Sequence, residues 1–135
     1  MKYLCLVYFE EAKLEALSRS EFDALVAEGV AFKDVLREGG HLVAAQALQS
    51  VRNATTLRRA GNGKLSMTDG PFAETKEQLG GFVMIEAKDL NEALQIAAKI
   101  PPGRLGAIEV RPILELATPR GASPSLYATH PETDR

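Results

Sequence analysis

The chain has 135 residues, of which 45% are hydrophobic and 25% charged, and its formal net charge is −2 at pH 7. This composition is typical of one globular domain and excludes an intrinsically disordered chain. Because no block of like charges occurs, we expect no nucleic-acid partner and no anionic membrane partner. The single cysteine, Cys5, excludes an internal disulfide and favours a small buried hydrophobe, since it lies in an apolar run.

The chain begins with an apolar run, "YLCLVYF" (Tyr3 to Phe9), which is too short to span a membrane and has no small-residue cleavage site after it. We therefore expect a cytoplasmic protein. Its aromatic and branched residues predict a strand. Both faces of that strand are apolar, since Leu4, Leu6 and Tyr8 alternate with a second apolar set. A strand of this kind is expected to be buried on both sides.

A long helix is predicted in "SRSEFDALVAEGVAFKDVLREGG". Apolar residues follow one another there at spacings of three and four, which gives one apolar face that includes Gly29. Ser18 with Glu21, or Ser20 with Asp23, can form a capping box at its start. The Gly39-Gly40 pair is expected to end it, and the preceding "EEAKLEAL" adds a short helical turn.

The following segments predict strands and one further helix. "HLVAAQAL" (His41 to Leu48) is a plausible strand, and "ATTLRRAGNGKLSMT" is typical of a hairpin around its Gly-Asn-Gly turn. "GGFVMIEA" is expected to form a strand, and "DLNEALQIAAKIP" a helix capped by Asp89 with Glu92 and stopped by Pro101. The last strand is expected over residues 107–116, where Pro112 suggests a sheet edge or a bulge.

This order of elements predicts an α+β fold, with a ferredoxin-like antiparallel sheet that carries both helices on one face. We expect it to occupy residues 1–116, followed by a proline-containing tail over residues 117–135. The doubly apolar first strand indicates that the other face of the sheet is covered too. Since nothing left in the chain is large enough, we expect a homodimer that packs sheet against sheet.

The stretch "MTDGPFAETKEQLGGF", residues 67–82, raises the question of a ligand site. Gly70-Pro71 predicts a rigid corner with Gly70 extended, and Phe72 is expected to anchor in the core. The Gly80-Gly81 pair at the start of a strand indicates close approach of another backbone or of a ligand. Such a corner suits a binding site and a tight connection equally well.

The titratable residues allow cofactor-free acid–base chemistry at most. Two distant histidines and one cysteine provide no metal-ligand cluster, and no dinucleotide or phosphate-loop motif occurs, so we expect no cofactor and no metal. Asp69 and His41 are the candidate catalytic pair. Each has a structural alternative, because Asp69 can cap a turn and His41 can bond the last helix carbonyls. The candidate ligand-binding residues are Lys76, Glu77, Arg111, Glu109 and Tyr8.

With these residues in place, the sequence resembles the DGPF family, a branch of the YCII-related proteins. The resemblance rests on "TDGPFAETKEQLGGFVMIEAKDLNEALQIAAKIP" followed by "EVRPI". It implies a dimeric α+β barrel, in which two ferredoxin-like protomers pack sheet against sheet around a cavity. It also implies, for some relatives, a His–Asp acid–base pair and a link to extracytoplasmic-function sigma factors.

The sequence therefore favours a dimeric protein that binds an unknown small molecule, with a regulatory role linked to a sigma factor as one form of that function. The alternative is a cofactor-free enzyme that uses Asp69 and His41 as acid and base. A purely structural dimer is a third hypothesis, and it explains the charged loop least well.

Overall fold

The computed structural model describes residues 1–116, so the predicted tail lies outside the described residues. In chain order, the elements are β1 (Lys2–Phe9), α1 (Glu11–Glu15), α2 (Arg19–Glu38), β2 (Leu42–Ala47), η1 (Val51–Asn53), β3 (Thr55–Arg59), β4 (Leu65–Asp69), β5 (Gln78–Glu86), α3 (Leu90–Ala97), η2 (Pro101–Leu105) and β6 (Gly106–Pro112).

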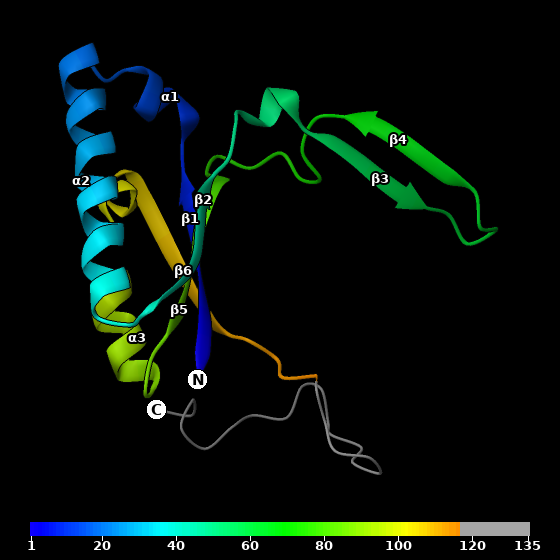
Figure 1. Cartoon of the computed structure of the whole chain (residues 1–135). Coiled ribbons are helices and arrows are strands. Elements are labelled where there is room, and N and C mark those ends of the chain that lie inside the picture. The colour runs from blue at the N-terminus through cyan, green and yellow to red at the C-terminus, as the bar shows by residue number, and fades with distance from the viewer. Residues whose placement is uncertain (117–135) are drawn as a thin grey trace, which may run out of the picture.

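Four of the strands form one antiparallel sheet in the order β2-β5-β1-β6, which confirms the predicted α+β, ferredoxin-like arrangement. The helices cover one face of this sheet (Figure 1). The sheet ends in two edge strands, β2 and β6, so one chain by itself does not form a closed barrel. Pro112 ends the edge strand β6, as its missing N–H requires.

The core lies between the helices and β1 and β5. Tyr3, Cys5, Val7 and Phe9 point to the helical side and are buried against residues of α2 and α3. The prediction of a buried Cys5 is confirmed, and burial raises the pKa of its thiol to about 11. This thiol is therefore unreactive at neutral pH.

The predicted helix ends are largely confirmed. The Ser18 hydroxyl accepts from the Glu21 amide while the Glu21 carboxylate accepts from the Ser18 amide, which completes the capping box of α2. Gly40, with φ 78°, follows the end of that helix. Asp89 caps α3, but the Glu92 carboxylate accepts from the Lys88 amide at 2.9 Å instead of from Asp89.

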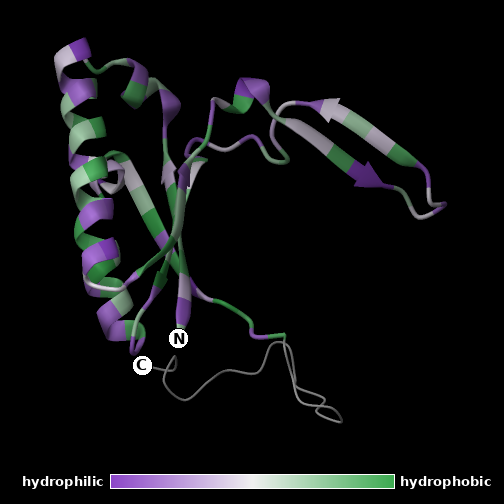
Figure 2. Ribbon diagram, viewed as in Figure 1, coloured by the Kyte–Doolittle hydropathy of each residue, from purple (hydrophilic) through white to green (hydrophobic). Residues whose placement is uncertain are grey.

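The β3–β4 hairpin stands apart from the main sheet, which the sequence did not predict. It forms a two-stranded sheet of its own and extends away from the body on the side opposite the helices (Figure 1). Hydrophobic and hydrophilic residues mix along it, as Figure 2 shows. The hairpin sequence fixes its turn but carries no signal about which sheet it joins.

The Gly80-Gly81 pair has a structural explanation. A Cβ at Gly81 would lie 2.8 Å from the Gln46 carbonyl oxygen of β2, and a Cβ at Gly80 would clash with the Phe9 ring. The predicted close approach is confirmed, and what approaches is the neighbouring strand and a core ring of the same chain.

The base of the hairpin is tied to the first helix by one carboxylate. Glu11 accepts hydrogen bonds from the Ser50 hydroxyl at 2.7 Å and from the Val51 amide at 2.9 Å. These two donors, the Ser50 hydroxyl first, lower the pKa of Glu11 below its ordinary value of 4.5, because they favour the charged form. The carboxylate thereby fixes η1, from which the hairpin starts.

We predict that Glu11→Gln lowers the free energy of unfolding by about 0.5–1 kcal/mol at pH 7, after allowing for solvent exposure. A group whose pKa is lowered by folding stabilises above its unfolded pKa, and this contribution is lost as pH falls through the folded value. The difference between the native protein and the variant should therefore shrink below pH 4.5. Urea unfolding at pH 7 and at acidic pH measures it. Glu15→Gln, which removes only an exposed ion pair with Arg52, is the control and should change little.

Candidate functional site

Asp69 is exposed at the end of β4, opposite Thr55 at the start of β3. Among the described residues, no hydrogen bond or ion pair reaches its carboxylate, so it does not cap the turn as its structural alternative proposed. The corner is held instead by the Gly70 amide, which donates to the Ala54 carbonyl at 2.8 Å, and by the Thr56 hydroxyl, which donates to the Gly70 carbonyl at 2.8 Å. Asp69 is therefore available to a ligand or to another chain.

Two expectations about this corner are wrong. Gly70 is not extended but has φ 105°, a conformation that residues with a Cβ rarely adopt. Phe72 does not anchor in the core, because its side chain is 74% exposed and its ring lies under the Arg58 guanidinium, 5.2 Å from the centroid. The Phe72 ring therefore packs on a surface cation of the hairpin and not in the core.

The loop after the corner is tied to the first helix. The Lys76 ammonium lies 3.3 Å from a carboxylate oxygen of Glu10, whereas Glu77 is exposed and accepts a hydrogen bond only through its backbone carbonyl. Lys76 is therefore paired with Glu10 and not with Asp69 or Glu77.

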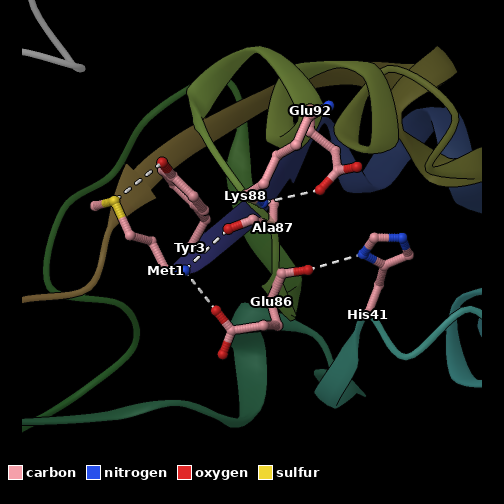
Figure 3. A network of polar contacts seen from close by, with 7 residues as sticks. All are labelled: Met1, Tyr3, His41, Glu86, Ala87, Lys88 and Glu92. Atoms are coloured by element: carbon pink, nitrogen blue, oxygen red, sulfur yellow. Dashed lines mark hydrogen bonds and ion pairs between the residues drawn. The ribbon is translucent and has the colours of Figure 1, made fainter.

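His41 directly precedes β2 and lies at the end of this strand that is farther from the hairpin. Its Nδ1 lies 2.8 Å from the Glu86 carbonyl oxygen, and because a carbonyl only accepts, Nδ1 donates this hydrogen bond. The imidazole therefore bonds the end of β5, while the His41 backbone amide donates to the Leu36 carbonyl in the last turn of α2 at 2.8 Å, so His41 bonds a last helix carbonyl through its main chain. Figure 3 shows it beside the group in which the Glu86 carboxylate pairs with the Met1 amine at 2.6 Å.

His41 and Asp69 are not brought together within one chain. His41 directly precedes β2, whereas Asp69 lies in the hairpin that follows the far end of this strand. A six-residue strand alone extends about 20 Å. Direct proton transfer between these two side chains would therefore require residues of different chains or a different conformation.

Tyr8, Glu109 and Arg111 do gather on one surface. In the ladders, Leu6 lies opposite Glu109 and Leu4 opposite Arg111, and the Tyr8 hydroxyl donates to the Glu109 carboxylate at 3.4 Å. Burial, followed by the nearby Glu109 charge, raises the pKa of Tyr8, while Arg111 acts in the opposite direction. These three residues lie along the β6 edge of the face that the helices leave uncovered.

This uncovered face, the open face, is apolar along its centre. Two rows cross the sheet, because directly paired residues point to the same side. From β2 to β6 the rows are Ala44, Met84, Leu4 and Arg111, and then Gln46, Phe82, Leu6 and Glu109. Leu4, Leu6, Phe82 and Met84 are only partly buried in the single chain.

A cleft lies between α2 and the helical side of the sheet. It has a volume of about 370 Å³, within the range of small-molecule sites, and its lining is almost entirely apolar. We call it the α2 cleft; its walls include Phe22, Val26, Gly29, Val30, Phe9, Ala45, Gly80 and Pro101. Val26 and Val30 are half exposed, so the helix does not close over the sheet here.

Two features shape the α2 cleft. Gly29 sits in the middle of α2, and a Cβ placed on it would meet nothing within 4 Å. The Arg104 guanidinium of η2 donates hydrogen bonds to both carboxylate oxygens of Glu28, at 2.7 and 3.2 Å. These bonds connect α2 to η2, which forms another wall of the cleft. Among the described residues that line the cleft, Lys33 is the only charged one, and no ion pair is formed by it.

The α2 cleft was not among the features predicted from the sequence. The residue that could have indicated the cleft is Gly29. It has no side chain and lies on the apolar face of a helix, so it leaves a notch where neighbouring positions carry valine and phenylalanine.

Among residues 1–116, no group of three or more potential metal ligands occurs, and no helix is long and apolar enough to cross a membrane.

The sequence matches one protein family over nearly its whole length. The model of the YCII-related domain matches residues 1–117. The chain belongs to the YCII-related family. An uncharacterised protein of Rhizobium meliloti (strain 1021) is 36% identical over 115 residues, which cover 84% of this chain and 92% of that protein.

The YCII-related domain therefore includes the open face, the hairpin and the α2 cleft, all of which lie within the matched residues. The relative's name assigns no activity, so the function has to be inferred from this chain's own geometry.

Proposed function

We propose that this YCII-related protein is a homodimer that binds a small amphipathic anion in the α2 cleft of each protomer. The observation that carries the proposal is a preformed apolar cleft of about 370 Å³ with one unpaired cation, Lys33, in its lining. The "DGPF" corner, residues 69–72, further supports its placement in the DGPF branch of the family.

The chemistry of the lining selects the class of ligand. Apolar walls favour a hydrocarbon or aromatic body through the area they remove from water. A lysine keeps its ammonium at the rim of an apolar surface while its methylenes lie along it. A carboxylate on the ligand would pair with this ammonium, so a medium-chain fatty acid or an aryl carboxylate fits both features.

The dimer is proposed through the open face. Leu4, Leu6, Phe82 and Met84 form a continuous apolar centre, bordered by Glu109 and Arg111. Sheets that pack face to face bury such centres at a spacing of about 10 Å. Two copies related by a twofold axis would place each open face on the other and would form the dimeric α+β barrel of the resemblance.

Ligand binding is tested by titrating decanoate into the native protein by isothermal calorimetry, with decanol as the uncharged comparison. We predict that Gly29→Phe abolishes binding, because the ring fills the empty space beside α2. Lys33→Met should weaken decanoate by about tenfold while leaving decanol unchanged, since only the ion pair is lost.

The matched control is Lys13→Met, which removes a cation from α1 that does not line the cleft. It should bind both probes as the native protein does. Binding of decanoate that is unchanged in Gly29→Phe would place the ligand elsewhere and overturn the proposed site.

A further inference from the structure

The β3–β4 hairpin exposes an apolar face that its own chain does not cover. In the ladder, Leu57 lies opposite Met67 and Arg59 opposite Leu65, so Leu57, Leu65 and Met67 share one face, which also carries Arg59 and, at the root of the hairpin, the Thr55–Asp69 pair. They are 58%, 49% and 72% exposed. Thr56 and Thr68 occupy the other face. An isolated two-stranded hairpin is only marginally stable in water, so an apolar face on it is expected to pack against something.

The hairpin extends past the open face. Figure 1 shows the helices on one side of the sheet and the hairpin on the other. A second copy packed on the open face would have its sheet about 10 Å away, whereas a strand of five residues extends about 17 Å. The hairpin is therefore long enough to reach beyond the seam and lie along the body of that second copy.

The charges of the hairpin are complementary to the rest of the chain. Residues 55–69 carry Arg58, Arg59, Lys64 and Asp69, a formal charge of +2. Because the whole chain sums to −2, the other residues sum to −4. A basic hairpin that lies on the acidic body of a second copy is attracted to it electrostatically, because the two charges are opposite in sign.

We propose that the β3–β4 hairpin is an arm that clasps a second copy of this chain, with Leu57, Leu65 and Met67 packed on the body of that copy. The arm is reciprocal, so a twofold dimer has two of them. The inference rests on the homodimer proposed above and adds a contact outside the open face.

Adjacent residues of β4 provide a matched test. Met67→Glu places a charge on the apolar face, and Thr68→Glu places the same charge on the opposite face. Sedimentation equilibrium should show the native protein as a dimer, with a dissociation constant at least about tenfold higher in Met67→Glu and within about twofold of native in Thr68→Glu. Leu6→Glu places a charge on the open face and serves as the variant that disrupts the proposed contact between the two open faces, which we call the seam.

A cross-linking experiment reports the contact directly in an otherwise native dimer. Cys5 is the only cysteine of the chain and is buried, so a cysteine introduced at position 67 is the only accessible thiol. After Met67→Cys is labelled with a benzophenone maleimide, illumination should yield covalent dimers, with cross-links mapped to the body of the second copy. Thr68→Cys should yield far fewer.

The outcomes separate the arm from the proposals on which it rests. A monomeric native protein overturns both the homodimer and the arm. A native dimer that only Leu6→Glu disrupts, or that both glutamates on β4 weaken equally, overturns the arm and leaves the open-face seam. Binding of a DNA duplex by the hairpin, with an unaffected dimer in Met67→Glu, would make it a nucleic-acid arm and overturn the clasp. Decanoate binding is measured separately and fails or holds without regard to these results.

Discussion

Val7→Glu is expected to unfold the protein, whereas Leu6→Glu is expected to leave a folded monomer. The Val7 side chain is 4% exposed in the core beneath the helices, and among the described residues no cation lies in the core cluster around it. An unpaired buried carboxylate costs several kcal/mol, a large part of the total stability of about 5–15 kcal/mol. Leu6 points the other way, to the open face, where a charge remains hydrated in the single chain.

The two variants are compared by circular dichroism melting and by light scattering at micromolar concentration. Val7→Glu should lack a cooperative transition near that of the native protein. Leu6→Glu should keep helical and strand signal but scatter as one chain, and the conservative Leu6→Met should remain dimeric. A dimeric Leu6→Glu would exclude the open face as the seam.

The fold was predictable because local patterns and tertiary packing agree in most of the chain. The first strand, the capping box at Ser18 and the N-cap at Asp89 each depend on residues near in sequence, and each is found where predicted. The position of the hairpin was not predictable in this way. Whether a two-stranded ribbon joins a sheet or leaves it depends on the connections at its base, such as the Glu11 contacts.

The candidate site was predictable only in part, for a related reason. Alternation along the last strand places Glu109 and Arg111 on one face, and the structure shows that Tyr8, a third candidate residue from the sequence, lies beside them. Phe72 was misplaced, because an apolar residue in a sequence does not reveal whether it enters the core or packs on a surface side chain such as Arg58. The α2 cleft was missed because it is defined by what α2 leaves empty, and a single glycine is a weak signal of empty space.

A substitution of glycine by alanine is expected to have opposite effects at two positions. At Gly106, at the start of β6, the new Cβ would collide with the Tyr8 carbonyl oxygen and lie 2.8 Å from the Phe9 Cα, and both obstacles are backbone of β1. Backbone in the centre of a sheet cannot move aside without loss of ladder hydrogen bonds, so Gly106→Ala should cost about 3 kcal/mol or more.

At Gly29 the same substitution should stabilise. The new methyl meets nothing within 4 Å, and alanine is the better residue inside a helix by about 1 kcal/mol. Urea unfolding of both variants beside the native protein measures the difference between their free energies of unfolding, which should be about 4 kcal/mol or more. A destabilised Gly29→Ala would mean that the space beside α2 is already filled in solution, and the α2 cleft would then lose its status as a ligand site. A stabilised Gly29→Ala with weakened decanoate binding would show that the notch serves ligand binding and not the helix itself, since α2 folds better without it.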